Sequence, residues 1–391
     1  MNLKLTGIAL FALITYTIDA QKVEVKKTFK EAAAQTNVML QGIPDARDGK
    51  PELITPRTLD NGKLKLVSSR DWTSGFFAGQ LWFLYEYTKD NYWKAKADSF
   101  TTLLNKEKLN AGTHDMGFKM YCSYGTGYRL TKDEQYKQVI IQSAKTLTKR
   151  FNKTIGSIKS WDFTVSNWQF PVIIDNMMNL ELLFAATRFT GDSSYYRIAV
   201  THANTTLKNH FRSDNSSYHV VDYDTVTGQV KSKQTAQGYA DGSAWARGQA
   251  WGLYGYTMCY RETKDKRYLE QAERIASFIM DHPNQPADAV PYWDYNDPTI
   301  PNTSRDASAA AVTASALYEL SGYSKNKRTY IAFADKVLTS LTRDYRSPIG
   351  DNKGFLLLHS TGHRPAKSEI DVPIIYADYY YLEALLRSRG K

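Results

Sequence analysis

One aspartate stands out in the stretch IIDNMMNLELLF, residues 173–184, because most of its neighbours are apolar. An unpaired charge is costly to bury, so Asp175 is expected to be paired, exposed or neutralised. Pro171 predicts a helix start, which would place Asp175 about one turn in and Asn179 on the same face. A carboxyl group that is desolvated and near a second acid has a raised pKa and suits a general acid. An aspartate in a buried hydrogen-bond network is the alternative interpretation.

A second acid lies in the stretch GTHDMGFKM, residues 112–120. His114 and Asp115 stand between two glycines, in a turn from which both side chains can point into a cleft. An aspartate that only caps a helix is the alternative.

The stretch TAQGYADGSAWARGQAWGLYGY, residues 235–256, combines tryptophans and an arginine with small residues that let a backbone approach a ligand closely. Arg247 offers a planar fork that suits a carboxylate. Trp245 and Trp251 are six residues apart and cannot share one helix face, but a loop-to-helix junction would let both line one cleft. For Arg247, a solvated salt bridge is the alternative.

Two further segments carry weaker signals. Trp72 precedes a Thr-Ser-Gly helix start, where a ring can be exposed at a cleft rim or packed in the core. His359, His363, Arg364 and Lys367 share one basic loop that could receive a sulfate or carboxylate, although ordinary solvated charge fits equally. No Cys/His cluster has zinc spacing, so neither a metal nor another cofactor is predicted.

A repeated pattern indicates which elements position these residues. Short polar turns such as TKDNYW and TKDEQY recur, and each is followed by an aromatic residue and then apolar positions at helical spacing. Successive units suit helical hairpins. The best strand signal is residues 216–230, with a Thr-Gly turn that predicts a β-hairpin. We therefore predict an all-α fold, an (α/α)6 barrel of six hairpins closed into a ring, with a short β-hairpin in a loop. An open solenoid would need polar capping repeats at its ends.

The first twenty residues differ from the rest of the 391-residue chain. Residues 1–20 have the layout of a secretory signal peptide, which leaves residues 21–391 as one catalytic domain. No second membrane span is apparent. The two cysteines, Cys122 and Cys259, could form a disulfide, but two small buried residues are the favoured interpretation.

The chain is basic, with a net charge of +10 and a pI near 9.2. No polybasic run or nucleic-acid motif is present, so neither nucleic acid nor a membrane is predicted as a partner. The 27 tyrosines and 8 tryptophans suit sugar faces. An acidic carbohydrate is the favoured ligand class.

At this point the chain resembles a known family. The motifs HDMGF, IIDNMMNLELLF and QGYADGSAWARGQAWGLYGY together look like the unsaturated glucuronyl hydrolases of glycoside hydrolase family 88, from about Trp72 to the C-terminus. The resemblance implies an (α/α)6 barrel. It also implies a substrate made by a polysaccharide lyase, an oligosaccharide with a 4,5-unsaturated uronic acid at its non-reducing end.

The resemblance further implies a hydration reaction. An aspartate protonates C4 of the enol-ether double bond, water adds at C5, and the hemiketal opens and expels the remaining sugar. Asp175 would be the general acid and then the base for water, with Asp115 as its partner. The residues that would surround the substrate are Trp72, His114, Trp161, Asn179, His219, Gln237, Trp245, Arg247, Trp251 and Lys367.

Three other functions are alternatives to an unsaturated glucuronyl hydrolase. The first is an unsaturated rhamnogalacturonyl hydrolase acting on pectin fragments, and the second is an inverting glycosidase on the same barrel. The third is a non-catalytic periplasmic oligosaccharide-binding protein. The expected destination is the periplasm of a Gram-negative bacterium. The sequence does not distinguish a glycosaminoglycan from an algal polymer such as ulvan as the source of the substrate.

Overall fold

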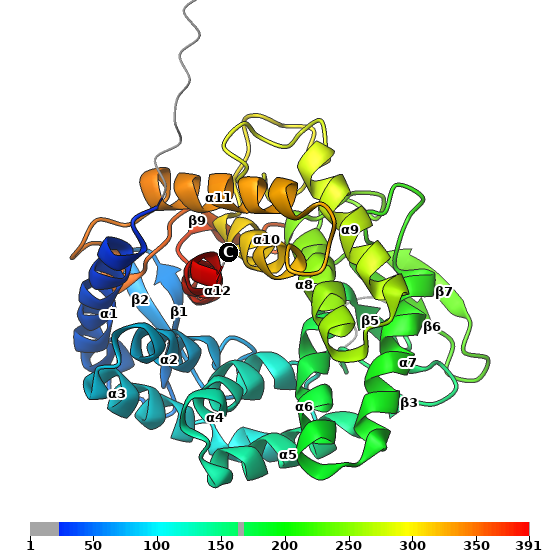
Figure 1. Ribbon diagram of the computed structural model, residues 1–391, viewed down its shortest axis with the longest axis horizontal. Coiled ribbons are helices and arrows are strands. Elements are labelled where there is room, and N and C mark those ends of the chain that lie inside the picture. Colours follow the sequence, from blue (N-terminus) through cyan, green and yellow to red (C-terminus); the bar gives the residue numbers. More distant parts are fainter. Residues whose placement is uncertain (1–22, 163–167, 391) are drawn as a thin grey trace, which may run out of the picture.

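The computed structural model describes residues 23–162 and 168–390, and these form a double ring of helices (Figure 1). The inner helices are α2 Phe76–Thr88, α4 Thr126–Thr131, α6 Leu180–Thr190, α8 Ala246–Thr263, α10 Ala307–Leu320 and α12 Ile375–Arg387. The outer helices are α1 Val25–Arg47, α3 Asn91–Thr102, α5 Glu134–Thr148, α7 Ser193–Asn209, α9 Lys266–Asp281 and α11 Lys327–Asp344. Inner and outer helices alternate along the chain, which confirms the predicted (α/α)6 barrel. The signal peptide predicted at residues 1–20 lies outside the described residues.

The recurring polar turns act as helix caps. The side chains of Asp90, Asp133, Asp192 and Asp265 each accept a hydrogen bond from the backbone N–H two residues later, at the start of an outer helix. Such a cap satisfies an N–H group that has no partner inside the helix. The inner helices α2, α4, α6 and α8 are thus each followed by a tight turn and an outer helix that packs beside them.

The two rings differ in how they are buried. The outer helix α9 buries one stripe at helical spacing, namely Tyr268, Ala272, Ile275 and Ile279. The inner helix α10 is buried almost throughout its length, and its alanines and serines let it pack closely against α8 and α12. Within the described residues, no helix is both long and apolar enough to cross a membrane.

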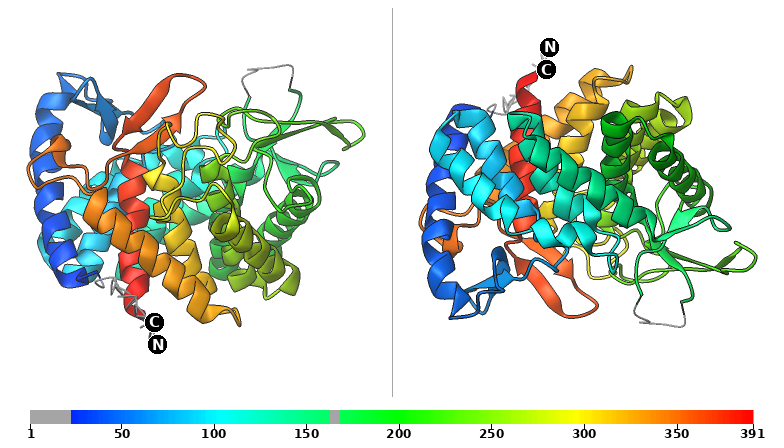
Figure 2. Two further views of the ribbon diagram at one scale, coloured as in Figure 1. Left: turned by 90° about the horizontal axis from the view of Figure 1, so that it is seen from above. Right: turned by 90° about the horizontal axis from the view of Figure 1, so that it is seen from below.

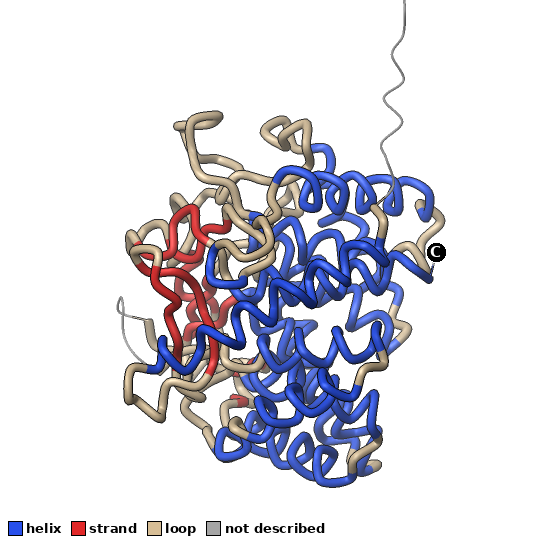
Figure 3. The backbone as a smooth tube through the Cα atoms, turned by 90° about the vertical axis from the view of Figure 1, so that its left-hand side faces the viewer, coloured by secondary structure: helices blue, strands red, loops and turns tan. Residues whose placement is uncertain are grey.

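The strands gather at one end of the barrel (Figures 2 and 3). They pair as β1 Thr55–Asp60 with β2 Lys63–Val67, β3 Phe151–Asn152 with β4 Ser157–Ile158, and β8 Ser360–His363 with β9 Ser368–Val372. A third group joins β5 Pro171–Ile173, β6 Val220–Tyr223 and β7 Val230–Gln234. These strands lie in the segments that lead into inner helices. We call this end, where the inner helices begin, the front, and the opposite end the rear.

Two local predictions need correction. Pro171 does not begin a helix, because it opens strand β5 and pairs with Asp222 of β6. The helix after it starts as a 3-10 helix, Ile174–Asn179, and becomes α6 only at Leu180. The hairpin predicted over residues 216–230 is present as β6 and β7, but β7 begins only at Val230 and runs to Gln234, and β5 adds a third strand. The Asp222 side chain holds β5 in place by accepting from the N–H groups of Gln169 and Phe170.

Both cysteines are free thiols. Cys259 is fully buried in α8 and Cys122 is half-buried, which agrees with the favoured interpretation of two small packed residues.

Candidate active site

The residues singled out for chemistry converge at the front of the barrel, on the first turns of inner helices and the segments before them. Trp72 precedes α2, Asp115 precedes the π-helix Gly117–Gly125 that continues into α4, and Asp175 lies in the 3-10 helix before α6. Arg247 lies in the first turn of α8. Closure of the ring therefore brings together side chains that are far apart in the sequence.

Asp175 is at the centre of this group. Its side chain is 11% exposed, and its Oδ2 atom accepts no hydrogen bond within the described residues. Burial raises the pKa of Asp175 to about 7, with Arg247 lowering it and Asp115 adding to the increase. The carboxyl group can therefore hold a proton near neutrality, as predicted.

His219 is neutral and turns a hydrogen-bond donor, its Nε2–H, toward Asp175. Its Nδ1 accepts from the N–H groups of Ala236 and Gln237, at 3.0 and 3.1 Å, so the ring proton is on Nε2. Nε2 lies 3.7 Å from Oδ2 of Asp175. Burial lowers the pKa of His219 well below its usual value, so the ring stays neutral.

His114 has the opposite tautomer. Its Nδ1 lies 2.7 Å from the carbonyl oxygen of Ser160, so Nδ1 carries the proton and donates it. Nε2 is then an acceptor, 3.1 Å from Oδ1 of Asp115 and without hydrogen-bond geometry to it. Burial lowers the pKa of His114. Two acceptors side by side can each receive a hydrogen bond from one of two neighbouring sugar hydroxyls.

Arg247 is already bound within the protein. Its Nη1 donates to Asp306 at 2.8 Å and to the Thr361 carbonyl at 2.6 Å, and Nη2 donates to the Gly362 carbonyl at 2.6 Å. The guanidinium stacks on the ring of Trp245, 4.5 Å from its centroid. Arg247 thus places a positive charge near Asp175, while most of its guanidinium N–H groups already donate to acceptors within the protein. Asp306 also caps α10, as a pairing or capping residue would.

The four predicted tryptophans occupy different depths. Trp72 and Trp161 are partly exposed, and Trp161 packs edge-on against the His219 ring with centroids 5.9 Å apart. Trp245 and Trp251 are buried, and the Trp245 ring lies 4.6 Å from that of His219. Of these four tryptophans, Trp72 and Trp161 are therefore the two that remain partly exposed to solvent.

The remaining predicted residues either hydrogen-bond to backbone groups or lie exposed on the surface. Asn179 accepts from the N–H groups of Gly117 and Phe118 at 2.7 and 3.1 Å, which links the Asp175 helix to the segment after Asp115. Gln237 donates from Nε2 to the Gly362 carbonyl at 3.0 Å. Lys367 is exposed in the turn between β8 and β9.

Buried polar atoms without a hydrogen-bond partner concentrate at this site. Within the described residues they include His114 Nε2, Asp175 Oδ2, Asn179 Nδ2, His219 Nε2, Arg247 Nε, Trp251 Nε1 and Tyr376 Oη. Folded proteins pair nearly all buried polar groups, so such a concentration marks a surface made to bind a polar ligand. Among the residues that the structure describes, no group of three or more His, Cys, Asp or Glu side chains is arranged to hold a metal ion.

Tyr376 is a site residue that the sequence interpretation missed. Its ring packs on Trp72, with centroids 5.0 Å apart, and lies under the Arg247 guanidinium at 5.4 Å. The only signal was its position in the apolar run VPIIYADYYYL, and nothing in that run separates Tyr376 from the other tyrosines.

The Asn179 bridge gives a testable prediction. Replacing Asn179 by Ala leaves two buried N–H groups unpaired, which should lower the free energy of unfolding by about 2–3 kcal/mol. It should also raise KM, because Asp115 loses its link to the Asp175 helix. Urea denaturation and steady-state kinetics check both effects, with Asn91→Ala on the exposed face of α3 as the control. A stability equal to that of the control would show that the bridge contributes nothing.

Comparison with known proteins places the chain in context. The model of the family described as Glycosyl Hydrolase Family 88 matches residues 54–258. An unsaturated glucuronyl hydrolase from Formosa agariphila is 56% identical over 326 residues, 83% of this chain and 81% of that protein. An unsaturated chondroitin disaccharide hydrolase from Streptococcus pneumoniae is 33% identical over 86% of each chain. A crystal structure of an unsaturated glucuronyl hydrolase specific for heparin is 48% identical, with a TM-score of 0.89 over 94% of this chain and 97% of that one.

Proposed function

This chain belongs to Glycosyl Hydrolase Family 88, and from that premise we propose that Asp175 is the acid that drives its reaction. The activity is that of an unsaturated glucuronyl hydrolase, which releases a 4,5-unsaturated uronic acid from the non-reducing end of an oligosaccharide by hydrating the C4=C5 double bond. The observation that carries the assignment is the buried Asp175 carboxyl group, whose pKa is raised to about 7 and whose Oδ2 has no hydrogen-bond partner in the described residues.

The reaction divides into proton transfer and water addition. Asp175 gives its proton to C4, and the positive charge that develops at C5 is shared with the ring oxygen. Asp175, now ionised, accepts a proton from the water that attacks C5. The hemiketal then opens, and the remaining sugar leaves from C1. One carboxyl group can serve both steps when its pKa is near the working pH.

Neighbouring groups assist each state of Asp175. The Nε2–H of His219 lies 3.7 Å from Oδ2 of Asp175, and a small approach would let it donate to the carboxylate after proton transfer. The charge of Arg247 favours the same ionised state and keeps the pKa of Asp175 from rising further. Asp115 and His114 present paired acceptors for hydroxyl groups of the unsaturated ring. We propose that Tyr376 and Trp251 supply the donors that face the substrate.

The pH dependence of the rate tests this proposal. A general acid acts only when protonated, so kcat/KM should fall about tenfold per pH unit above the Asp175 pKa, which is about 7. Loss of absorbance of the conjugated uronate follows the reaction directly. A kcat/KM that rises steadily through neutrality would contradict an acid role for Asp175.

The polysaccharide that supplies the substrate is a separate proposal. We propose unsaturated disaccharides from glycosaminoglycans, produced by a polysaccharide lyase, because the similar proteins include enzymes described for chondroitin and heparin. A panel of chondroitin, heparin, hyaluronan and ulvan fragments would rank them. Lys367→Ala should lower activity on sulfated fragments only, if the basic β8–β9 turn receives a sulfate.

Export is also proposed. The apolar run within residues 1–20, followed by Ala20 and Gln21, supports cleavage and delivery to the periplasm. N-terminal sequencing of the protein from a periplasmic extract tests this, and a retained Met1 would contradict it.

A further inference from the structure

One cavity within the described residues lies away from the proposed active site. It has a volume of about 560 Å³, and it is lined by the π-helix, by both ends of α6 and by residues of α2, α4, α8 and α12. Arg129 and Lys132 lie at the end of α4, Arg188 at the end of α6 and Arg387 at the end of α12. We call it the rear cavity. Its volume falls in the range of about 300–1,000 Å³ that is typical of small-molecule sites.

The walls of the rear cavity carry an interhelical ion-pair network. Arg261 of α8 pairs with Glu181 of α6 and with Glu319 of α10, and Arg387 of α12 pairs with Glu319 and Glu383. Glu262 and Arg188 form another pair. Arg129 and Glu86 pair at the same cavity, and Lys132 lines it as well. Together with Glu319 behind the lining, five carboxylates thus face four guanidiniums and one ammonium, and the charges balance.

One wall group keeps an open hydrogen-bonding position. Glu181 Oε1 accepts from Arg261, while Oε2 accepts no hydrogen bond within the described residues, and the side chain is 22% exposed. Burial, together with Glu262, Glu319 and Glu383, raises the pKa of Glu181 against the effect of Arg261. Perturbed acids that face a cavity are frequent at binding sites.

Aromatic rings complete the lining. Tyr128, Phe189 and Tyr254 border the cavity, and the Tyr128 ring lies 5.5 Å from the Lys132 ammonium at the end of α4. Flat ring faces suit the C–H faces of a pyranose, and forked Arg and Glu groups suit adjacent hydroxyls. Because the acidic and basic groups of the cavity balance, its lining favours neither an anion nor a cation.

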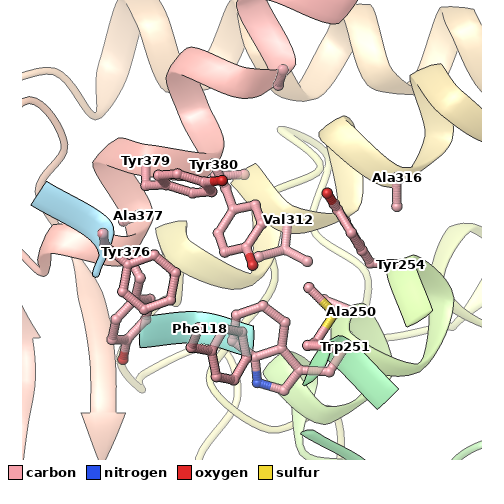
Figure 4. Close-up of a cluster of buried hydrophobic side chains, with 14 of the residues drawn as sticks. Phe118, Ala250, Trp251, Tyr254, Val312, Ala316, Tyr376, Ala377, Tyr379 and Tyr380 are labelled. Carbon is pink, nitrogen blue, oxygen red and sulfur yellow. The ribbon is translucent and has the colours of Figure 1, made fainter. Parts of the chain in front are cut away.

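A single layer of side chains separates the rear cavity from the active site. Phe118 lines the cavity, and its ring also packs on Trp72 and Trp251, with centroids 5.5 and 5.1 Å apart. Gly117 lines the cavity as well and donates to Asn179. Figure 4 shows Phe118 in one cluster with Trp251, Tyr376, Tyr379 and Tyr380. A molecule in the rear cavity would therefore touch the support of the catalytic group.

We propose that the rear cavity is a second binding site, which takes an uncharged saccharide of one or two residues and is distinct from the site that binds the unsaturated uronate. Occupancy of this site changes the rate without competing with substrate, because the two sites share Phe118 but no open space.

Calorimetry with the Asp175→Asn protein tests the inference. The protein is first titrated with an unsaturated chondroitin disaccharide, which reports the active site, and then, once saturated, with lactose or cellobiose. A second saturable binding event is expected. Because the two titrations are separate, failure of the proposed catalytic site is distinguished from failure of the rear site.

Two cavity variants locate the binding. Leu386→Trp fills space at the cavity wall without removing a polar partner, and Glu181→Gln removes the open acceptor charge. Each should weaken lactose or cellobiose binding at least about tenfold, or about 1.4 kcal/mol. Glu270→Gln, an exposed change on α9, should leave binding unchanged.

The thiols give an independent readout. Cys122 lines the rear cavity and Cys259 is buried, so bound saccharide should slow the reaction of Cys122 with methyl methanethiosulfonate. The inference is overturned if neither sugar binds at tens of millimolar, if the unsaturated disaccharide displaces the bound sugar, or if Leu386→Trp binds like the wild type.

Discussion

Asp175→Asn should lower kcat/KM on unsaturated disaccharides by about a thousandfold, within the range of about 10²–10⁴ for loss of a general acid or base. Asn preserves the shape of the side chain but can neither give a proton to C4 nor take one from water. The KM or Kd should change little, since Asp175 is surrounded by other binding groups. Absorbance of the conjugated uronate measures turnover, and calorimetry measures binding. Retained turnover would remove Asp175 from the mechanism.

The same variant should be more stable than the wild type at alkaline pH. The folded-state pKa of Asp175 is about 7, above the unfolded value of about 3.9. The folded state therefore binds the proton more tightly, and stability falls as pH rises between these two values. The full penalty, at most about 4 kcal/mol, is present above the folded pKa. The melting temperature of Asp175→Asn should exceed that of the wild type at high pH and approach it in acid.

An exposed carboxylate provides the control for this measurement. Glu52→Gln, on the surface after α1, should show no pH-dependent difference from the wild type. A difference between Asp175→Asn and wild type that is independent of pH would indicate a packing effect instead of relief of a buried charge.

Arg247→Met should lower the free energy of unfolding by about 3–5 kcal/mol, the usual cost of removing one partner from a buried ion pair. Arg247 and Asp306 are 1% and 0% exposed at their side chains, so the variant leaves Asp306 charged and buried. The Thr361 and Gly362 carbonyls also lose their donors. In the protein that still folds, the Asp175 pKa should rise, because Arg247 lowers it. Urea denaturation and the alkaline limb of the pH–rate profile measure the two effects.

A double variant separates the ion pair from packing. Asp306→Asn added to Arg247→Met removes the uncompensated charge and keeps an oxygen for the α10 cap, which Asp306 provides to Ser308 and Ala309. The double variant should be more stable than Arg247→Met alone. If the double variant is less stable than the wild type by the sum of the losses measured for Arg247→Met and Asp306→Asn alone, the two residues act independently. The ion pair then carries no coupling energy.

The sequence determined the helical repeat and the identity of the central acid. The Asp caps and the helical apolar spacing depend on contacts within about four residues, so they are visible in the chain itself. Asp175 is also visible in the chain itself, because a single carboxylate in an apolar segment is costly to bury unless it has a specific role. Family motifs then connected Asp175 to its reaction.

Tertiary structure decided what surrounds that acid. The start of the Asp175 segment as a strand depends on pairing of Pro171 with Asp222, which is 51 residues further along and leaves no local trace. The partners of Arg247 come from α10 and β8, so its fork appeared free when only neighbouring residues were considered. The tautomers of His114 and His219 follow from distant backbone groups. The lack of a partner for the Tyr376 hydroxyl within the described residues is likewise visible only in the folded chain. The sequence therefore pointed to Asp175 as the proposed acid. Closure of the ring set the pKa and the neighbours of Asp175, because electrostatics and burial depend on distance in space and not along the chain.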